Sequence, residues 1–407
     1  MSTEKNNSQE KTTLIILNES DIAFIAGIIK DFDFDEIAAF DITLIDKIKL
    51  HTNKTVRFIN PINHTDINNR LRLSEELAKQ VEDEINLKIN KSKFKIESIG
   101  WNFRNYSYLF QTLIWYRNLF KGVSDFFIKN KIIFFIPNKN PSFYLTSFLP
   151  SLILYEHCIK DGIKFEILSY DMQEPVFFTP DKNQELPSFD ILTYIPTLFY
   201  DQHIVDEAIK RLNLTPLLLD SPLWNVDLHG YKNIKLRRIA EDEISTSEIF
   251  KSISDTHLEV LAPYISAYIE NKDYIKKICL NYSKNYYSQF LTFDYIKNIF
   301  ETRKFKFILS TEHDAGFHGP LITAAKEFNM PVVMIPHSKV MPKNEFNHKK
   351  IFRVAHAIQN PKSKSLNHFH SHIDYKKNIT FTQDLYKPKK NHSSDFKWYL
   401  SQWHVLF

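Results

Sequence analysis

The run Ile132–Ile136 is the feature that most narrows the fold of this chain. Its residues, IIFFI, are all apolar, so a strand made of them must be buried on both faces, as in parallel sheets whose strands are connected by helices. A polar loop follows, then an apolar helical stretch at 143–160 that ends at Asp161-Gly162, and then a second strand-like run at Ile163–Leu168. This order predicts a β-loop-α-β unit within a parallel sheet.

Two further stretches repeat this order. In the first, Asp190–Ile195 and Thr215–Leu219 are predicted strands around a helix at 202–212. In the second, Phe305–Ser310 is a predicted strand, Thr311–Gly319 a loop, Pro320–Phe328 a helix and Pro331–Ile335 a strand. Other predicted strands lie at Thr13–Asn18, Val56–Asn60, Phe352–Ile358 and Ile379–Thr382. We therefore expect an α/β fold with a doubly wound, mostly parallel, Rossmann-like sheet, in which ligands bind beyond the carboxyl ends of the strands.

Helical patterns fill most of the remaining sequence. They cover 34–50, 73–90, 103–130 and 240–304, and the aromatic residues of 103–120 have the spacing of a helix that faces a core. We expect a disordered tail at 1–12, an N-terminal α/β and helical region at 13–125, and a Rossmann-like region at 126–385 with a helical insertion at 240–304. A basic and aromatic C-terminal tail would follow at 386–407. The sequence shows no internal repeat.

Composition excludes several classes of protein. The net charge of +4 over 407 residues gives no basic patch of the kind that nucleic-acid binders carry. Two cysteines, Cys158 and Cys279, lie in apolar helical patterns and are expected to be buried free thiols. The polar N-terminus does not look like a secretion signal, and no apolar run reaches the roughly 20 residues of a membrane span. We therefore expect a cytoplasmic protein.

Glycine usage points to the loop at 311–319. The chain has only seven glycines, and two of them, Gly316 and Gly319, stand in this loop. Such a pair suggests a backbone that turns sharply or approaches another group closely. Gly319-Pro320 also predicts a helix start with Pro at the first position. The free N–H groups and the positive dipole end of such a helix suit a phosphate.

Polar side chains gather in the same loop and after the next predicted strand. Glu312, His313, Asp314 and His318 belong to the loop, and the second cluster consists of His337, Ser338 and Lys339. If the two strands are parallel neighbours, both clusters lie at one edge of the sheet. A histidine or aspartate there could accept the proton of an acceptor hydroxyl, and His337 and Asp314 are the best candidates, with His313 beside them. The alternative is a solvated loop whose polar groups cap the backbone.

Two weaker sites remain open. Asn138, Lys139 and Ser142 follow a buried strand and could hold a phosphate, although a turn that caps the next helix is the favoured explanation. The alternating histidines of 367–372 could bind a metal, but a solvated loop is favoured and no metal site is assigned. The sequence contains no Walker loop, GxGxxG, HExxH or GxSxG motif, which counts against P-loop kinases, dehydrogenases, zinc proteases and α/β-hydrolases.

The stretch 305–343 resembles a known class of enzyme. A strand, a loop with Asp and Gly, a helix and then Pro331-Val332-Val333-x-Ile335-x-His337 are similar to the end of the N-terminal lobe in GT-B-type glycosyltransferases of bacterial surface-polysaccharide synthesis, such as capsule or lipopolysaccharide. The same stretch is similar to CDP-glycerol glycerophosphotransferases. Ser338 stands where these families carry Gly. The resemblance implies that 132–168 is an earlier unit of the same lobe and that His337 lies between two lobes as a candidate base.

The resemblance also implies a function. We expect a metal-independent transferase that moves a sugar from a nucleotide-sugar donor to a glycan or lipid-linked acceptor, with the nucleotide-sugar as substrate and no resident cofactor. Because few residues follow His337, either the second lobe is incomplete or the division between lobes lies near 230–300. The C-terminal tail could pack on the body or contact a membrane or a partner protein. A non-catalytic, partner-binding lobe and a sugar-nucleotide epimerase or hydrolase are the alternatives.

Overall fold

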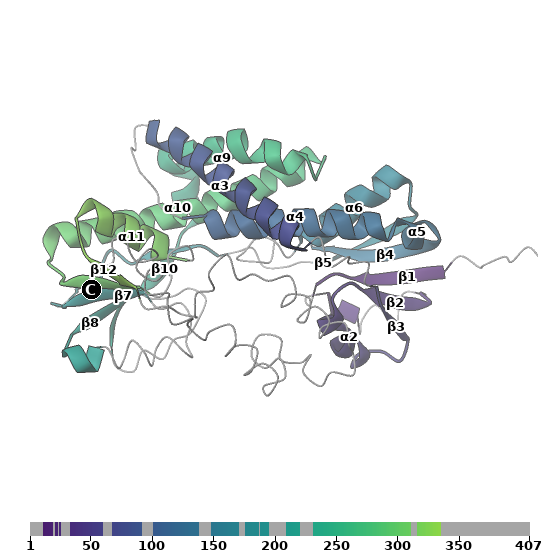
Figure 1. The fold of residues 1–407 in the computed structure, drawn as a ribbon, viewed down its shortest axis with the longest axis horizontal. Coiled ribbons are helices and arrows are strands. Elements are labelled where there is room, and N and C mark those ends of the chain that lie inside the picture. Colours follow the sequence, from purple (N-terminus) through teal and green to yellow (C-terminus); the bar gives the residue numbers. More distant parts are fainter. Residues whose placement is uncertain are drawn as a thin grey trace, which may run out of the picture.

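Two parallel β-sheets lie below one shared layer of helices (Figure 1). The structure is a computed structural model, and it describes residues 11–18, 21–22, 24–25, 33–59, 67–91, 101–137, 148–170, 176–186, 188–194, 209–219, 231–310 and 316–334. No helix in this part of the chain is long and apolar enough to cross a membrane.

The first sheet has five parallel strands in the order β3-β2-β1-β4-β5. They are β1 (Lys11–Ile16), β2 (Glu36–Ala39), β3 (Thr55–Phe58), β4 (Asn130–Pro137) and β5 (Phe165–Tyr170). β4 contains the run IIFFI, and all five residues of that run are buried, as the sequence predicts.

The second sheet is also parallel and has five strands in the order β12-β11-β7-β8-β9. They are β7 (Ile191–Tyr194), β8 (Pro216–Leu219), β9 (Lys232–Ile234), β11 (Phe307–Ser310) and β12 (Val332–Met334). When the strands are numbered within each sheet in chain order, both sheets read 3-2-1-4-5. This order is compatible with a Rossmann-like fold. A short antiparallel pair, β6 (Phe178–Pro180) and β10 (Leu236–Arg238), lies outside both sheets.

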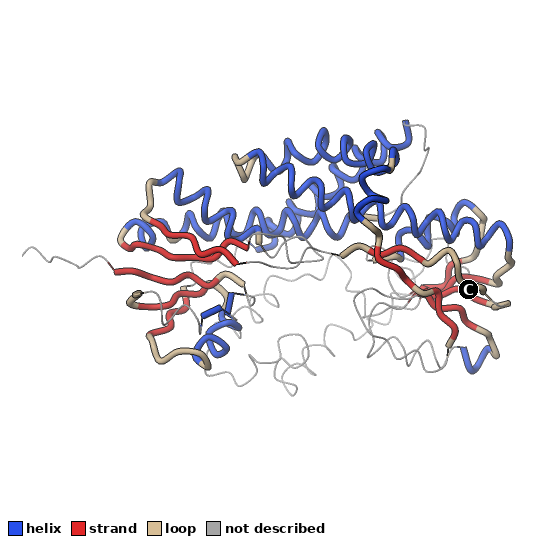
Figure 2. Tube along the Cα trace, turned by 180° about the vertical axis from the view of Figure 1, so that it is seen from behind, coloured by secondary structure: helices blue, strands red, loops and turns tan. Residues whose placement is uncertain are grey.

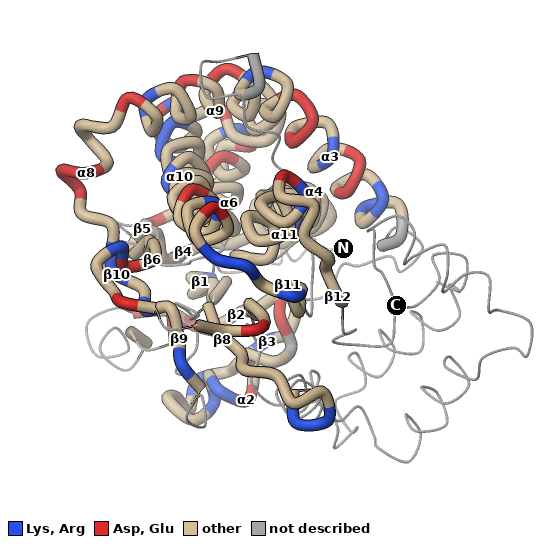
Figure 3. The backbone as a smooth tube through the Cα atoms, turned by 90° about the vertical axis from the view of Figure 1, so that its left-hand side faces the viewer, with Lys and Arg blue, Asp and Glu red and all other residues tan. Residues whose placement is uncertain are grey.

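The helical layer is built from the same connection in each lobe. Between the third and fourth strands the first lobe inserts α3 (Ile67–Lys91), α4 (Phe103–Gly122) and α5 (Ser124–Ile128). The second lobe inserts α8 (Glu241–Thr246), α9 (Glu248–Ser266) and α10 (Lys272–Thr302) at the equivalent place. Figure 2 shows these helices side by side over both sheets, with α3 in contact with α9. Acidic and basic residues are interspersed along these helices (Figure 3).

Helices cover both faces of the first sheet, so it is doubly wound. α2 (Ile42–Lys49) packs on one face, where Leu44 and Ile48 join a separate apolar cluster. α6 (Leu149–Asp161) packs on the other face, on the side of the helical layer. In the second lobe α11 (His318–Glu327) takes the position of α6, since it also follows the fourth strand and packs on the side of the layer. The prediction of an α/β fold with parallel sheets is confirmed.

One continuous apolar core joins the two lobes. It contains Ile132 and Phe134 of the first sheet, Leu192 and Ile308 of the second, and the inner faces of the helical layer. Cys158 and Cys279 are part of it as buried free thiols, and burial raises the pKa of each to about 12, as expected of inert core cysteines.

Buried polar contacts fix how the helices of the layer meet. The indole nitrogen of Trp101, just before α4, donates to the hydroxyl of Thr323 on α11 at 2.9 Å. The Tyr106 hydroxyl lies 2.9 Å from Nε2 of His257, whose Nδ1 lies 2.9 Å from the Ile253 carbonyl oxygen. Burial lowers the pKa of His257 to about 4, so this histidine is neutral and Nδ1–H donates to the carbonyl while Nε2 accepts from the tyrosine.

The carboxyl ends of both sheets point toward the middle of the molecule. In Figure 1, β4 begins beside α5 at the outer right end, and β8 begins beside the helical turn of 209–212 at the outer lower left. Each sheet is parallel, so all of its strands run in the same direction as the one named here. The edges at which α/β proteins bind ligands therefore lie on the inner sides of the two lobes.

Several expectations from the sequence are corrected. The helical pattern at 34–50 divides into strand β2 and helix α2, because EIAA is a buried central strand with paired neighbours on both sides. The short strands β6, β9 and β10 are not predicted from the sequence. The boundary at 126 runs through the first sheet, since β4 pairs with β1. The units at 132–168 and 305–335 belong to different sheets, because β11 pairs with β7 and not with β4 or β5.

The Trp101–Thr323 contact yields a test of how the layer is joined to the second lobe. Trp101→Phe removes the donor and leaves a void around a side chain that is 1% exposed. We expect a loss of about 2 kcal/mol in the free energy of unfolding. Trp115→Phe on α4 is the matched control, because Trp115 is partly exposed and lies beside Arg70. It should lower the free energy of unfolding clearly less. Equal losses in urea unfolding of the two variants would contradict the assignment.

Candidate functional site

Each sheet has a topological switch point at which a ligand crevice is expected. In the order 3-2-1-4-5 the connections after strands one and four leave toward opposite faces of the sheet, which opens a crevice between them. In the first sheet this point lies between β1 and β4, and in the second it lies between β7 and β11. The loop that the sequence singles out, 311–319, follows β11 and therefore begins at the second switch point.

A compact buried cluster closes the end of β7 and β11. The Ser310 hydroxyl at the end of β11 lies 2.6 Å from Nδ1 of His318, the first residue of α11. The His318 ring meets the ring of Tyr194, the last residue of β7, edge-on at 4.6 Å between centroids. Tyr194 is 1% exposed and the other two side chains are fully buried. The cluster joins the two strands of the switch point to the start of α11.

Gly316 is required by this cluster for two independent reasons. Its φ of +53° lies in the left-handed region that disfavours residues with a side chain. A Cβ built on it would also come 2.5 Å from the hydroxyl oxygen of Tyr194. The sharp turn and the close approach that the scarce glycines predict are therefore both present at this position.

The N-terminus of α11 has no side-chain cap. Its N-cap residue is Phe317, and no acidic residue lies in the first turn. The sequence predicts Pro320 as the first residue of this helix. The helix in fact begins at His318, so Pro320 is its third residue. The first N–H groups of a helix have no partner within it and carry the positive end of the dipole. The backbone N–H of Gly319 in this first turn is therefore a candidate donor to an anion beside the switch point.

The structure brings together only some of the residues predicted from the sequence. Gly316, His318 and Gly319 meet at the start of α11, but His318 is buried and acts on the position of the helix rather than on a ligand. The other predicted residues lie outside the described part of the chain: Glu312, His313, Asp314, His337, Ser338, Lys339, Asn138, Lys139 and Ser142. The histidines of 367–372 lie outside it as well. The structure shows no cluster of metal-binding side chains among the residues that it describes.

The first switch point carries a buried carboxyl group that the sequence reading missed. Asp21, just after β1, accepts hydrogen bonds from the backbone N–H groups of Leu17 and Asn18 at 3.1 and 3.0 Å, and from the Tyr170 hydroxyl at 2.9 Å. Phe24 stacks on Tyr170 with ring centroids 4.2 Å apart. Asp21 is fully buried, and desolvation raises the pKa of its carboxyl to about 6 despite the three donors. An aspartate three residues after the predicted strand Thr13–Asn18 was the available signal.

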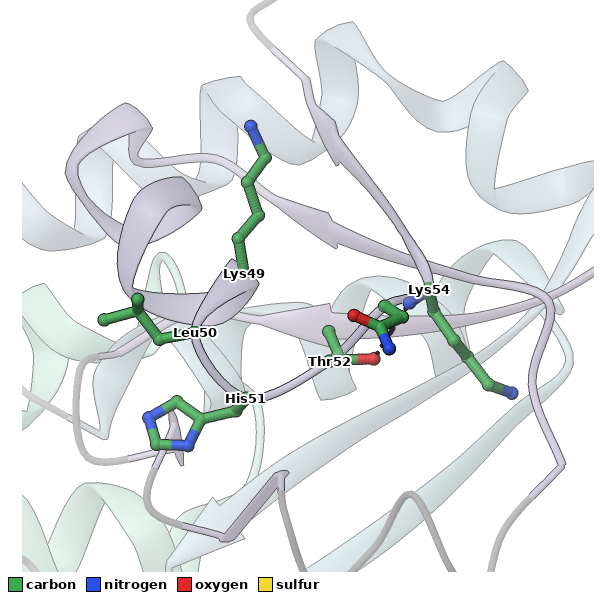
Figure 4. Close-up of a pocket in the computed structure, with 6 residues that line it drawn as sticks. Lys49, Leu50, His51, Thr52 and Lys54 are labelled. Carbon is green, nitrogen blue, oxygen red and sulfur yellow. Dashed lines mark hydrogen bonds between the residues drawn. The ribbon is translucent and has the colours of Figure 1, made fainter.

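A surface hollow in the described residues lies away from both switch points. It is lined by Lys49, Leu50, His51, Thr52, Asn53 and Lys54 (Figure 4). These residues connect α2 to the start of β3, so the hollow lies at the amino edge of the first sheet. The Lys54 ammonium group is already engaged, since it donates to the Phe34 carbonyl and lies 4.0 Å from the centroid of the Phe34 ring. We assign no function to this hollow.

Comparisons of this chain with known protein families, with curated proteins and with solved structures find no match.

The two reasons for Gly316 can be separated by experiment. Gly316→Ala should cost more than about 2 kcal/mol in the free energy of unfolding, since the strain of a left-handed alanine adds to the contact with Tyr194. Gly162→Ala is the matched control, because Gly162 has a φ of +64° and no atom within 4 Å of a new Cβ. It should cost only about 1 kcal/mol. A double-mutant cycle with Tyr194→Phe should recover part of the loss at Gly316, and no coupling would refute the contact.

The Asp21 carboxyl predicts an unusual dependence of stability on pH. Its pKa rises on folding from 3.8 to about 6, so the folded state binds the proton more tightly than the unfolded state does. Its contribution therefore favours folding at low pH and is lost as the pH rises through 4 to 6, on the order of 2–3 kcal/mol. Urea unfolding gives the free energy of unfolding of Asp21→Asn and of the natural protein at pH 4 and at pH 7. The difference between variant and natural protein should shift by that amount in favour of the variant from pH 4 to pH 7. A variant equally destabilised at both pH values would contradict this.

Proposed function

We propose that this protein is a transferase of the GT-B glycosyltransferase type, which binds a nucleotide-activated sugar between its two lobes. The observation that carries the proposal is the pair of parallel sheets with the same 3-2-1-4-5 order and with carboxyl ends turned toward the middle of the molecule. Nucleotides bind at such edges in Rossmann-like proteins. The resemblance of 305–343 to glycosyltransferases and to CDP-glycerol glycerophosphotransferases supports the same class, although β11 and β12 lie in the second lobe.

The start of α11 is the proposed site for the diphosphate of the donor. The backbone N–H of Gly319 in its first turn supplies a donor, and Gly316 lets the backbone turn beside it without a side chain in the way. The buried Tyr194–His318–Ser310 cluster would hold these groups in position against the pull of an anion. As the bond between sugar and diphosphate breaks, negative charge gathers on the leaving oxygen, and donors aimed at it lower the barrier.

The acceptor hydroxyl needs a base. The sequence predicts His337 and Asp314 as candidate bases. Both lie outside the described residues, so their roles rest on the sequence alone. In this proposal one of them takes the proton from the hydroxyl while the new bond to the sugar forms and the nucleoside phosphate departs. Lys339 is the predicted side-chain partner of the phosphates.

A second candidate is a nucleotide-binding lobe without catalysis. The observation that favours it is the burial of every side chain in the cluster at the second switch point. A binding module needs only the backbone donors of α11, whereas a transferase also needs an exposed base.

A thermal-shift screen of the full chain tests the proposal. The probes are CMP, CDP, UDP, GDP and dTDP and their common sugar conjugates. A ligand that binds only the folded state raises the melting temperature by mass action, and we expect one nucleotide to do so. Gly316→Ala should abolish the shift, and Gly162→Ala, with the same backbone strain in the other lobe, should keep it. The absence of a shift with any probe would overturn the donor site.

Transfer activity separates the two candidates. With the nucleotide sugar identified in the screen, the combined change of His337→Ala and Asp314→Asn should abolish transfer and leave the thermal shift intact. Undiminished transfer in this variant would remove both residues from the mechanism. Binding without any transfer or hydrolysis by the natural protein would favour the binding lobe.

A further inference from the structure

The first lobe carries a second helix start of the same kind as α11. α6 begins after the fourth strand of its lobe, as α11 does, with Phe148 at the N-cap, no side-chain cap, and Pro150 in the first turn. No acidic residue lies in that turn. The N-cap and the first three helical residues are buried, namely Phe148, Leu149, Pro150 and Ser151. A helix start that is buried without a cap needs another partner for its N–H groups.

Ser151 shows where such a partner would lie. Its side chain is fully buried, and its hydroxyl has no hydrogen-bond partner among the described residues. Side chains of a helix lean toward its N-terminus, so the hydroxyl of this third helical residue is directed at the same end as the free N–H groups. A buried hydroxyl without a partner costs free energy, which a ligand oxygen placed there would recover.

A second unpartnered group flanks the same switch point from the other strand. The side-chain amide nitrogen of Asn18, just after β1, is buried and has no acceptor in the described part of the chain. β1 and β4 are neighbours, and the chain leaves them toward opposite faces of the sheet. Asn18 and the start of α6 both lie at the carboxyl edge of the first sheet, after neighbouring strands, and each has a donor to offer.

We propose that the first lobe holds a phosphate group at the start of α6, bound by the N–H groups of its first turn, the Ser151 hydroxyl and the Asn18 amide. All of these groups are donors, and the dipole of a helix of 13 residues favours negative charge at that end. The carboxyl of Asp21 lies near Asn18, but both of its oxygens already accept hydrogen bonds, one from the backbone N–H groups of Leu17 and Asn18 and the other from the Tyr170 hydroxyl.

The ligand is accordingly a phosphorylated compound distinct from the nucleotide at α11. In the setting of the proposed transferase, on which this one assignment rests, it is an acceptor that itself bears a phosphate. The phosphate site stands on the first lobe alone and does not require the donor site.

Titration of the full chain with inorganic phosphate, at constant ionic strength and followed by phosphorus NMR, tests the site. Ser151→Ala should weaken phosphate binding roughly tenfold, the equivalent of one hydrogen bond to a charged group. Because it removes an unpartnered buried hydroxyl, the same variant should be at least as stable as the natural protein in the absence of phosphate. Asn18→Asp, which replaces a donor by a carboxylate, should abolish binding.

Ser283→Ala is the matched control. Ser283 is also a fully buried helical serine, but its hydroxyl donates to the Cys279 carbonyl at 2.8 Å. This variant should lose stability and keep its affinity for phosphate. Phosphate binding that is absent, or that is unchanged in both Ser151→Ala and Asn18→Asp, would overturn the proposal. Binding lost only in Gly316→Ala would also overturn it, since the phosphate would then lie at α11.

The same variants distinguish this inference from the proposed function. If phosphate binding depends on Ser151 but no nucleotide shifts the melting temperature, the phosphate site stands and the transferase proposal fails. If a nucleotide binds through the region of Gly316 and phosphate binding does not depend on Ser151, the donor site stands and the phosphate site at α6 fails.

Discussion

Burial of two long helical connections against each other is the interaction on which the rest of this structure depends. Each lobe reaches from its third to its fourth strand through helices, α3 to α5 in the first and α8 to α10 in the second. These helices, together with the inner faces of both sheets, form one apolar core. Relative motion is the usual behaviour of two domains unless their interface is large and hydrophobic. A shared core of this kind favours a fixed arrangement of the lobes.

This arrangement determines where chemistry can occur. A parallel sheet offers ligands only its carboxyl edge, and the helical layer holds the two lobes so that both edges point inward. The Trp101–Thr323 hydrogen bond joins the start of α4 directly to α11, the helix that begins beside the second switch point. Packing in the layer and position at the candidate site are therefore parts of one network of contacts.

The polar groups at the two edges have different tasks. Asp21, His318 and Ser310 are buried, and each holds backbone or a neighbouring side chain in position. In both proposed sites the groups that would meet a ligand are mostly backbone N–H groups at the starts of α6 and α11, where no side chain caps the helix. Backbone donors bind anions without a recognisable motif, which is consistent with the absence of a Walker loop or a GxGxxG sequence.

The sequence alone determined the fold class and the place of the candidate loop. The run IIFFI requires a strand buried on both faces, and the rarity of glycine marks Gly316, because apolar continuity and backbone freedom are local properties of a chain. Pairing is not local. EIAA gives strand β2 only because β1 and β3 flank it, and β11 likewise pairs with β7 rather than β4 because of its tertiary neighbours. The sequence shows no internal repeat, and yet the two lobes have the same strand order. Likewise the burial of Asp21 and the unpartnered hydroxyl of Ser151 depend on neighbours that only the tertiary structure supplies.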